Sequence, residues 1–318
     1  SQLADSAECA VSRQVLADDS MRHLCFSAVN FLANVATRYE TELPKGYVAM
    51  QRDTEKATQA NRLAWNASAD RHRQSREWQR QLEGFADPAF STFDPVITAV
   101  LRENGIEGAR VVQVACNNGR ETLSALALGA ARATGIDQSD AFIAQAEELR
   151  AVSPLGAGAR FVCANVYELP DGLSAGADLA LITIGALNWM PDLTRFLKVV
   201  SSLLAPGGRL VIYETHPVLD MFDPHGDNPH GLRYSYFRQE PFVTEDEIVY
   251  DGSAAGKAPP SYWHFHTMGD IVTGCVRAGL QILELTEYPH SNREVDYDVY
   301  VGNEAQLPLC YTLVAAKP

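Results

Sequence analysis

The chain has 318 residues, of which 46% are hydrophobic and 21% are charged, as is typical of a globular protein with a large buried core. Its formal net charge of −14 argues against a nucleic-acid surface, because such surfaces cluster Lys and Arg. Polar residues interrupt the apolar segments well before they reach the length of a membrane span. We therefore expect neither nucleic acid nor a membrane as a partner.

The six cysteines stand at positions 9, 25, 116, 163, 275 and 310, and no two of them form a Cys-x-x-Cys pair. Several lie within apolar patterns, which favours buried free thiols in a reducing compartment. The sequence shows no charged and then apolar leader for export. These features predict a cytoplasmic protein.

Residues 1–95 are expected to form a helical N-terminal extension. From Met21 to Tyr39, apolar residues recur at the spacing of one helix face, so this helix packs on the domain or on a second subunit of a homodimer. A polar helix is expected from about Asp53 to Leu82, and it carries Trp65 and Asn66.

Residues 111–120, Val-Val-Gln-Val-Ala-Cys-Asn-Asn-Gly-Arg, predict a strand that ends in a tight turn and leads into a helix. Such a turn lets the backbone approach a ligand, and the N–H groups at the helix start can hold a negative group. Of the turn's three small positions, only Gly119 is glycine. Ala115 and Asn117 fill the others, and Asn tolerates left-handed backbone angles.

A second strand, over residues 133–136, leads directly to Asp137. Nucleotide-binding folds place an acid there to bind ribose hydroxyls. The tight turn and this acid together indicate a cofactor that contains adenosine.

Two more strands are expected at 161–166 and 178–185, followed by a helix from Pro191 to Leu204. A Pro-Gly-Gly turn at 206–208 ends that helix, and a further strand covers 209–214. In this order of features the chain, from about residue 96 to 318, resembles the class I S-adenosylmethionine-dependent methyltransferases. The resemblance implies a Rossmann-like α/β domain with a seven-stranded, mostly parallel sheet whose last strand is antiparallel.

The resemblance also implies S-adenosylmethionine as the cofactor. The first turn would face its methionine part, Asp137 its ribose, and Asn165 with Val166 its adenine, while Ile184 and Gly185 would lie beneath the sulfonium. Gln113 departs from the family, because an acid is common at that position late in the first strand. The expected cofactor-binding residues are Ala115, Cys116, Asn117, Asn118, Gly119, Asp137, Gln138, Asn165, Val166, Ile184 and Gly185. In many similar methyltransferases a helix before the sheet closes over the cofactor, which makes Trp65 and Asn66 candidates for a lid.

An insertion of about 45 residues, at about 217–262, follows the fifth strand and is rich in aromatic residues and histidine. Ordered insertions of this length are often functional, so we interpret it as a cap over the substrate. Alternation predicts strands at 234–237 and 262–266. The candidate substrate-binding residues are Trp189, Tyr236, Trp263, His266 and Tyr288, any of which could instead belong to the core.

His216 follows the fifth strand and is the candidate general base, because a neutral imidazole accepts a proton near pH 7. A purely structural role beside Pro217 is the alternative. His264 and His266 share one face of an expected strand and could hold a metal, but a His-x-His pair without a nearby carboxylate pattern is weak evidence. No metal is therefore expected.

These features predict a methyltransferase that acts on an oxygen, or a nitrogen, of a small aromatic or apolar metabolite, as in a tailoring step of secondary metabolism. One alternative is a cofactor-binding relative with other chemistry, such as cyclisation. Another is a non-catalytic binding protein on the same fold. A nicotinamide oxidoreductase is the third, because the first turn alone does not distinguish the two cofactors.

Overall fold

The computed structural model describes residues 45–171, 173, 176–249, 255–292 and 294–318. The chain divides into two compact units, residues 1–53 and 54–318. Of the first unit, the structure describes only the beginning of helix α3, which runs over Lys45–Arg73. The helix expected at residues 21–39 lies outside the described residues.

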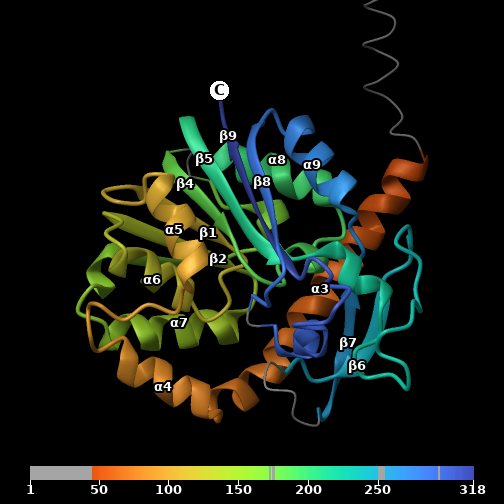
Figure 1. Cartoon of the computed structure of the whole chain (residues 1–318). Helices are drawn as coiled ribbons and strands as arrows, with labels where there is room; N and C mark the ends of the chain where they lie inside the picture. The colour runs from red at the N-terminus through yellow and green to blue at the C-terminus, as the bar shows by residue number, and fades with distance from the viewer. Residues whose placement is uncertain (1–44, 172, 174–175, 250–254, 293) are drawn as a thin grey trace, which may run out of the picture. The chain divides into compact units, whose positions relative to one another are not determined.

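A seven-stranded sheet forms the centre of the second unit (Figure 1). Its strand order is β3-β2-β1-β4-β5-β9-β8. The strands are β1 Arg110–Val114, β2 Arg132–Asp137, β3 Ala159–Cys163, β4 Ala177–Ile182, β5 Leu204–Thr215, β8 Gln281–Tyr288 and β9 Cys310–Ala316. The pairs among β1 to β5 are parallel, whereas β9 runs antiparallel to both of its neighbours. The expected α/β sheet with an antiparallel last strand is confirmed.

Helices cover both faces of the sheet because its strands carry apolar side chains on both sides. One face packs against α4 (Arg76–Gly84), α5 (Pro95–Glu103), α6 (Arg120–Ala127) and α7 (Asp140–Val152). The other packs against α8 (Leu193–Leu203) and α9 (Met268–Arg277). Parallel strands buried on both faces bring their carboxyl ends to one edge, and that edge is where such sheets bind ligands.

The polar helix expected from about 53 to 82 is two helices, α3 and α4. The break lies at Ser75, whose backbone is extended and whose hydroxyl oxygen accepts a hydrogen bond from Trp78 N (3.1 Å). Serine is a strong N-cap residue, so it starts a new helix within a sequence whose polar pattern is otherwise continuous.

Strand β5 begins at Leu204, before the Pro-Gly-Gly sequence that was expected to separate helix from strand. Leu204 pairs with Ala177 and Arg209 with Leu179, so the residues between them form a bulge. Gly207 adopts a φ of +77° and its N–H donates to Lys317 O (2.8 Å). The turn therefore survives as an irregularity within the strand.

The insertion after β5 forms a two-stranded antiparallel hairpin, β6 (Phe242–Asp246) and β7 (Lys257–Trp263). The strand expected at 234–237 is wrong, because that segment is a turn in which Arg238 N donates to Ser235 O (3.1 Å). The second expected strand is confirmed over Tyr262 and Trp263, with Trp263 paired to Phe242.

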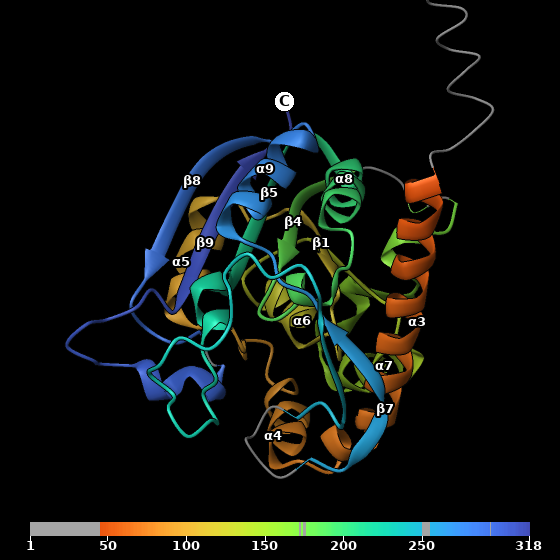
Figure 2. The same cartoon turned by 90° about the vertical axis from the view of Figure 1, so that its right-hand side faces the viewer.

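Helix α3 is attached to this hairpin, and the two lie side by side in Figure 2. The fully buried side chain of Asn61 donates to Tyr262 O (3.0 Å) and accepts from Tyr262 N (2.6 Å), as a neighbouring strand would. Farther along α3, Ser68 Oγ accepts from Ile248 N (2.9 Å) and Arg71 pairs with Glu247 (2.9 Å). None of the described helices is both long enough and apolar enough to span a membrane.

Replacing Asn61 by Ala should lower the free energy of unfolding by about 2–4 kcal/mol, because Tyr262 N–H and C=O would lose their partner in a buried setting. Urea unfolding measures this loss. Asn303→Ala is the matched control, since Asn303 is exposed, and it should change stability by less than about 0.5 kcal/mol. Equal stability of the two variants would show that Asn61 does not hold the hairpin.

Candidate active site

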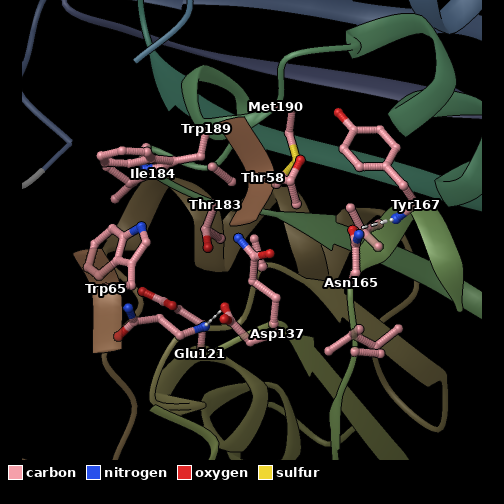
Figure 3. A pocket seen from close by; sticks show the side chains of 18 of the residues that line it. Thr58, Trp65, Glu121, Asp137, Asn165, Tyr167, Thr183, Ile184, Trp189 and Met190 are labelled. Atoms are coloured by element: carbon pink, nitrogen blue, oxygen red, sulfur yellow. Dashed lines mark hydrogen bonds between the residues drawn. The ribbon is translucent and has the colours of Figure 1, made fainter. Parts of the chain in front are cut away.

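A cavity lies at the carboxyl ends of β1 to β4, and it encloses about 820 Å³ of space including the solvent at its mouth (Figure 3). Each of these strands supplies the residue or short segment that directly follows or ends it. The lining residues are Thr58, Trp65, Ala115, Asn117, Arg120, Glu121, Ile136, Asp137, Gln138, Ala164, Asn165, Val166, Tyr167, Thr183, Ile184, Gly185, Ala186, Trp189 and Met190. The topology thus gathers residues that are far apart in sequence.

The turn after β1 has a left-handed backbone at all three of its small positions. The φ angles are +57° at Ala115, +51° at Asn117 and +75° at Gly119. A Cβ atom at Gly119 would come within 2.4 Å of the Phe161 ring, so glycine is required there for space as well as for conformation. Ala115 carries a local strain because its Cβ crowds the backbone in this region. The turn keeps its shape although two of its glycines are absent.

Asp137 joins this turn to the end of β2. Its two carboxylate oxygens accept hydrogen bonds from Asn117 N (2.8 Å) and Ser139 N (2.9 Å), and Figure 3 shows the first of these. Burial raises the pKa of Asp137, whereas the backbone N–H groups oppose that rise. The carboxylate lines the cavity and fixes the turn at once.

Glu214, near the end of β5, holds the loop after β4 from beneath. Its carboxylate accepts from Gly185 N (2.6 Å) and Leu187 N (3.0 Å). The side chain is 2% exposed, and burial raises its pKa to about 8. This buried acid sets the position of Ile184 and Gly185 at the floor of the cavity.

Helix α3 closes the cavity from the other side. Trp65 lines it and packs edge-on against Trp189, with ring centroids 5.3 Å apart. Asn66 anchors the helix, because its amide donates to Asp140 Oδ1 (2.8 Å) and accepts from Ser139 Oγ (2.6 Å). The lid candidates, Trp65 and Asn66, therefore lie beside the cavity and next to the turn that follows Asp137.

Eight of the eleven expected cofactor-binding residues line this cavity: Ala115, Asn117, Asp137, Gln138, Asn165, Val166, Ile184 and Gly185. The other three support the turn from behind. Cys116 is fully buried, Gly119 packs on Phe161, and Asn118 donates to Gln81 Oε1 (2.9 Å).

A second cavity adjoins the first, and it encloses about 1790 Å³ of space including the solvent at its mouth. Arg120 and Ile184 line both cavities. The second cavity is lined further by Arg71, His72, Ser75, Glu77, Trp78, Arg80, Gln81, Ser91, Thr92, Phe93, Asp94, Asn118, Val249, Glu294 and Val295. Polar and charged residues outnumber apolar ones on these walls.

Of the expected substrate-binding residues, Trp189 lines the first of these two cavities, and the other four line neither. Trp263 packs edge-on against Trp189, with centroids 5.1 Å apart, and His266 Nε2 bonds to Met190 O (2.8 Å). Tyr236 accepts from Met268 N (2.9 Å), and the Tyr288 hydroxyl bonds to that of Thr312 (3.1 Å). Trp263 and His266 thus contact wall residues of the first cavity from outside, whereas the partners of Tyr236 and Tyr288 line neither cavity.

His216 lines neither cavity, and both of its ring nitrogens are engaged. Nδ1 accepts from Val218 N (3.1 Å), and Nε2 lies 2.7 Å from Glu287 Oε1. Burial lowers the pKa of this imidazole, which favours a neutral ring that donates from Nε2 to Glu287. The geometry corresponds to the structural alternative, a histidine that caps its own turn.

The His266 ring is likewise engaged, whereas Nδ1 of His264 is buried and has no hydrogen-bond partner among the described residues. His264 N donates to Asn188 O (2.7 Å), and burial together with His266 lowers the pKa of the His264 ring to about 4. Among the residues that the structure describes, no three His, Cys, Asp or Glu side chains are grouped to hold a metal ion.

Residues 112–212 match the family model described as a methyltransferase domain. This segment carries the first turn, Asp137 and the loop after β4, and its strands have the order described above. The match and the strand order together identify a class I S-adenosylmethionine-dependent methyltransferase domain in this chain. A search of curated proteins finds no match to it.

Solved structures share this methyltransferase fold at low sequence identity. A putative S-adenosylmethionine-dependent methyltransferase from Listeria monocytogenes is 18% identical, with a TM-score of 0.50, over 69% of this chain and 97% of that one. A protein from Pyrococcus horikoshii is 14% identical, also with a TM-score of 0.50, over 77% of this chain and 93% of that one. These likenesses support the fold.

The cavity of this methyltransferase fits a nucleoside cofactor. Asp137, the residue expected to bind the ribose, lines the cavity, and the left-handed turn leaves room for close approach of a ligand. Thr58 adds a third indication, because its hydroxyl is buried, lines the cavity and has no hydrogen-bond partner among the described residues. A ligand with polar groups would satisfy it.

Sequence reasoning missed several lining residues of the methyltransferase site. Thr58 gave no signal, since tertiary contacts alone bring it to the cavity. Arg120 and Glu121 could have been found: they directly follow the first turn, and a cation at a helix start opposes the helix dipole.

The buried Glu214 should make stability depend on pH. Its folded pKa of about 8 exceeds its ordinary value of 4.5, so the folded state retains a proton that the unfolded state loses, and the free energy of unfolding falls as pH rises between these values. Glu214→Gln should flatten this part of the profile in urea unfolding. The exposed Glu103→Gln is the control, and an unchanged slope in Glu214→Gln would assign the pH dependence to other groups.

Proposed function

We propose that this methyltransferase binds S-adenosylmethionine in the first cavity and transfers its methyl group to a small acceptor. The observation that carries the proposal is the meeting of the left-handed turn, the Asp137 carboxylate and the loop at Ile184 in one cavity. S-adenosylmethionine would supply a methyl group on a sulfonium, from which the neutral thioether S-adenosylhomocysteine departs as a good leaving group in an in-line displacement. The protein's contribution is to hold the two reactants together and in line.

The second cavity is the proposed acceptor site. It meets the first at Ile184, which the family resemblance places beneath the sulfonium, so an acceptor there would lie next to the reacting centre. Trp78 and Phe93 offer apolar surface, while most of the lining side chains are polar or charged. This supports an acceptor that combines an apolar part with a hydroxyl or an amine.

Glu294 is the proposed general base, since His216 lines neither cavity. Its carboxylate lines the second cavity, and burial together with Asp296 raises its pKa to about 7, while Arg120 opposes the rise. A base with a pKa near the working pH can remove a hydroxyl or ammonium proton efficiently. The positive charge of Arg120, a residue that lines both cavities, therefore acts on the Glu294 carboxylate.

The alternative functions differ in the ligand that the protein would bind and in the product that it would release. Cyclisation or another non-methylating reaction would bind the cofactor without producing S-adenosylhomocysteine. A binding protein on the same fold would show no turnover, and a nicotinamide oxidoreductase would bind NAD. None of these accounts explains the polar cavity that opens at Ile184 better than methyl transfer does.

Calorimetric titration should detect micromolar binding of S-adenosylhomocysteine by the wild type. Asp137→Ala should weaken it at least tenfold, because a charge-assisted hydrogen bond is lost and the first turn loses its anchor. Asp70→Ala, at an exposed position of α3, is the control and should bind as the wild type does. Binding of NAD, or of neither ligand, would contradict the proposal.

With an acceptor identified by screening for labelled methyl transfer, Glu294→Gln should lower kcat/KM by about 10²-fold. The wild-type rate should rise with pH through about 7, as Glu294 loses its proton, and the variant should lack this rise. His216→Gln should keep the rise, because His216 lies outside both cavities. A loss of the rise in His216→Gln instead would restore His216 as the base.

A further inference from the structure

The charged groups of the first cavity are unevenly placed. Among its lining residues only Arg120, Glu121 and Asp137 carry charge, and the first two are neighbours in the first turn of α6. Asp137 accepts two backbone N–H groups at the position expected for ribose. The remaining two residues, Arg120 and Glu121, carry one positive and one negative charge. These charges are complementary to the carboxylate and the ammonium group of an amino acid.

The neutral side chain of Gln113 on β1 accounts for the position of the acidic residue, Glu121, on α6. Gln113 is fully buried on β1 where the family commonly has an acid, and its amide donates to Glu121 Oε2 (3.3 Å) and Thr183 Oγ1 (3.1 Å). Its carbonyl accepts from Thr122 Oγ1 (2.6 Å). An acid at 113 would place two carboxylates within hydrogen-bonding distance in a buried setting, where like charges disfavour each other. The neutral amide at 113 and the acid at 121 are therefore complementary.

Glu121 is 5% exposed, yet its carboxylate lines the cavity (Figure 3). Arg120 Nε lies 3.1 Å from Glu121 Oε1, and the Arg120 side chain is also buried in large part. A cation at a helix N-terminus is unfavourable, so the position of Arg120 suggests selection for a ligand or for its pairing with Glu121. Both signs of charge thus stand beside the turn that is expected to face the methionine part of the cofactor.

We propose that Glu121 has taken over the place of the missing β1 acid and binds the α-ammonium group of the cofactor, while Arg120 faces its carboxylate. This inference rests on the proposed function and adds the residues that select the amino-acid end. It makes Glu121 a binding residue in this chain, with Gln113 as the positioning residue that orients it. The adenosine end depends on other side chains, so the two ends can be tested separately.

The test compares two ligands by calorimetry: S-adenosylhomocysteine, which has the amino-acid end, and 5′-methylthioadenosine, which lacks it. Glu121→Gln should weaken binding of the first about tenfold or more and of the second less than twofold, since a charge-assisted hydrogen bond is lost for the first alone. Glu103→Gln, at an exposed position of α5, is the matched control and should change neither.

Equal affinities of wild type and Glu121→Gln for S-adenosylhomocysteine, or equal losses for both ligands, would overturn the inference. Binding of neither ligand by the wild type would overturn the proposed function instead, so the two failures are distinguishable. Melting temperature reports whether the variant is folded.

A double variant, Gln113→Glu with Glu121→Gln, moves the carboxylate to β1 within the same hydrogen-bond network, and it serves as the test if Glu121→Gln alone fails to fold. Residue 113 is fully buried and does not line the cavity, so the moved carboxylate cannot reach the ligand, and the selectivity for S-adenosylhomocysteine over 5′-methylthioadenosine should stay lost. A folded double variant that keeps this selectivity would contradict the assignment of the ammonium contact to Glu121.

Discussion

The bond between Asp137 and the turn after β1 is the constraint on which the site depends. A single carboxylate accepts the N–H of Asn117 in that turn and the N–H of Ser139 at the start of the next helical connection. It compensates for the strain of a left-handed turn in which two glycines are replaced by Ala115 and Asn117. The same carboxylate lines the cavity, so one group both stabilises the turn and is available to bind a ligand.

The lid and the cap form one connected layer above this turn. Asn66 ties α3 to the residues that follow Asp137, while Asn61 ties the same helix to strand β7. Asn188, in the loop after β4, bonds to the backbone of His264 at the end of the hairpin. The expected lid and cap are thus coupled to each other and to the cavity floor, and the cap stabilises the walls more than it lines them.

The strands and the first turn could be predicted from the sequence, because they follow from local apolar patterns and from turns at strand ends. The seven-stranded sheet and most of the cofactor cavity followed from the family resemblance. The break at Ser75 could not, since one hydroxyl cap interrupts a continuous polar pattern. The strand expected at 234–237 failed because alternation over four residues does not distinguish a strand from a turn with alternating exposure. The aromatic residues of the insertion predicted that the cap binds the substrate. In the structure Trp263 and Tyr236 contact other residues of the protein and pack against them. Glu294 carried no local signal, because only its burial beside Arg120 makes it notable.

A crystal structure with S-adenosylhomocysteine bound would test the central claim most directly. The account predicts that the ribose contacts Asp137, that the sulfur lies over Ile184 and Gly185, and that the amino-acid end reaches Arg120 and Glu121. It also predicts that the second cavity stays open at the sulfur. A ligand bound elsewhere, or one whose amino-acid end fills the second cavity, would contradict the account of where methyl transfer occurs.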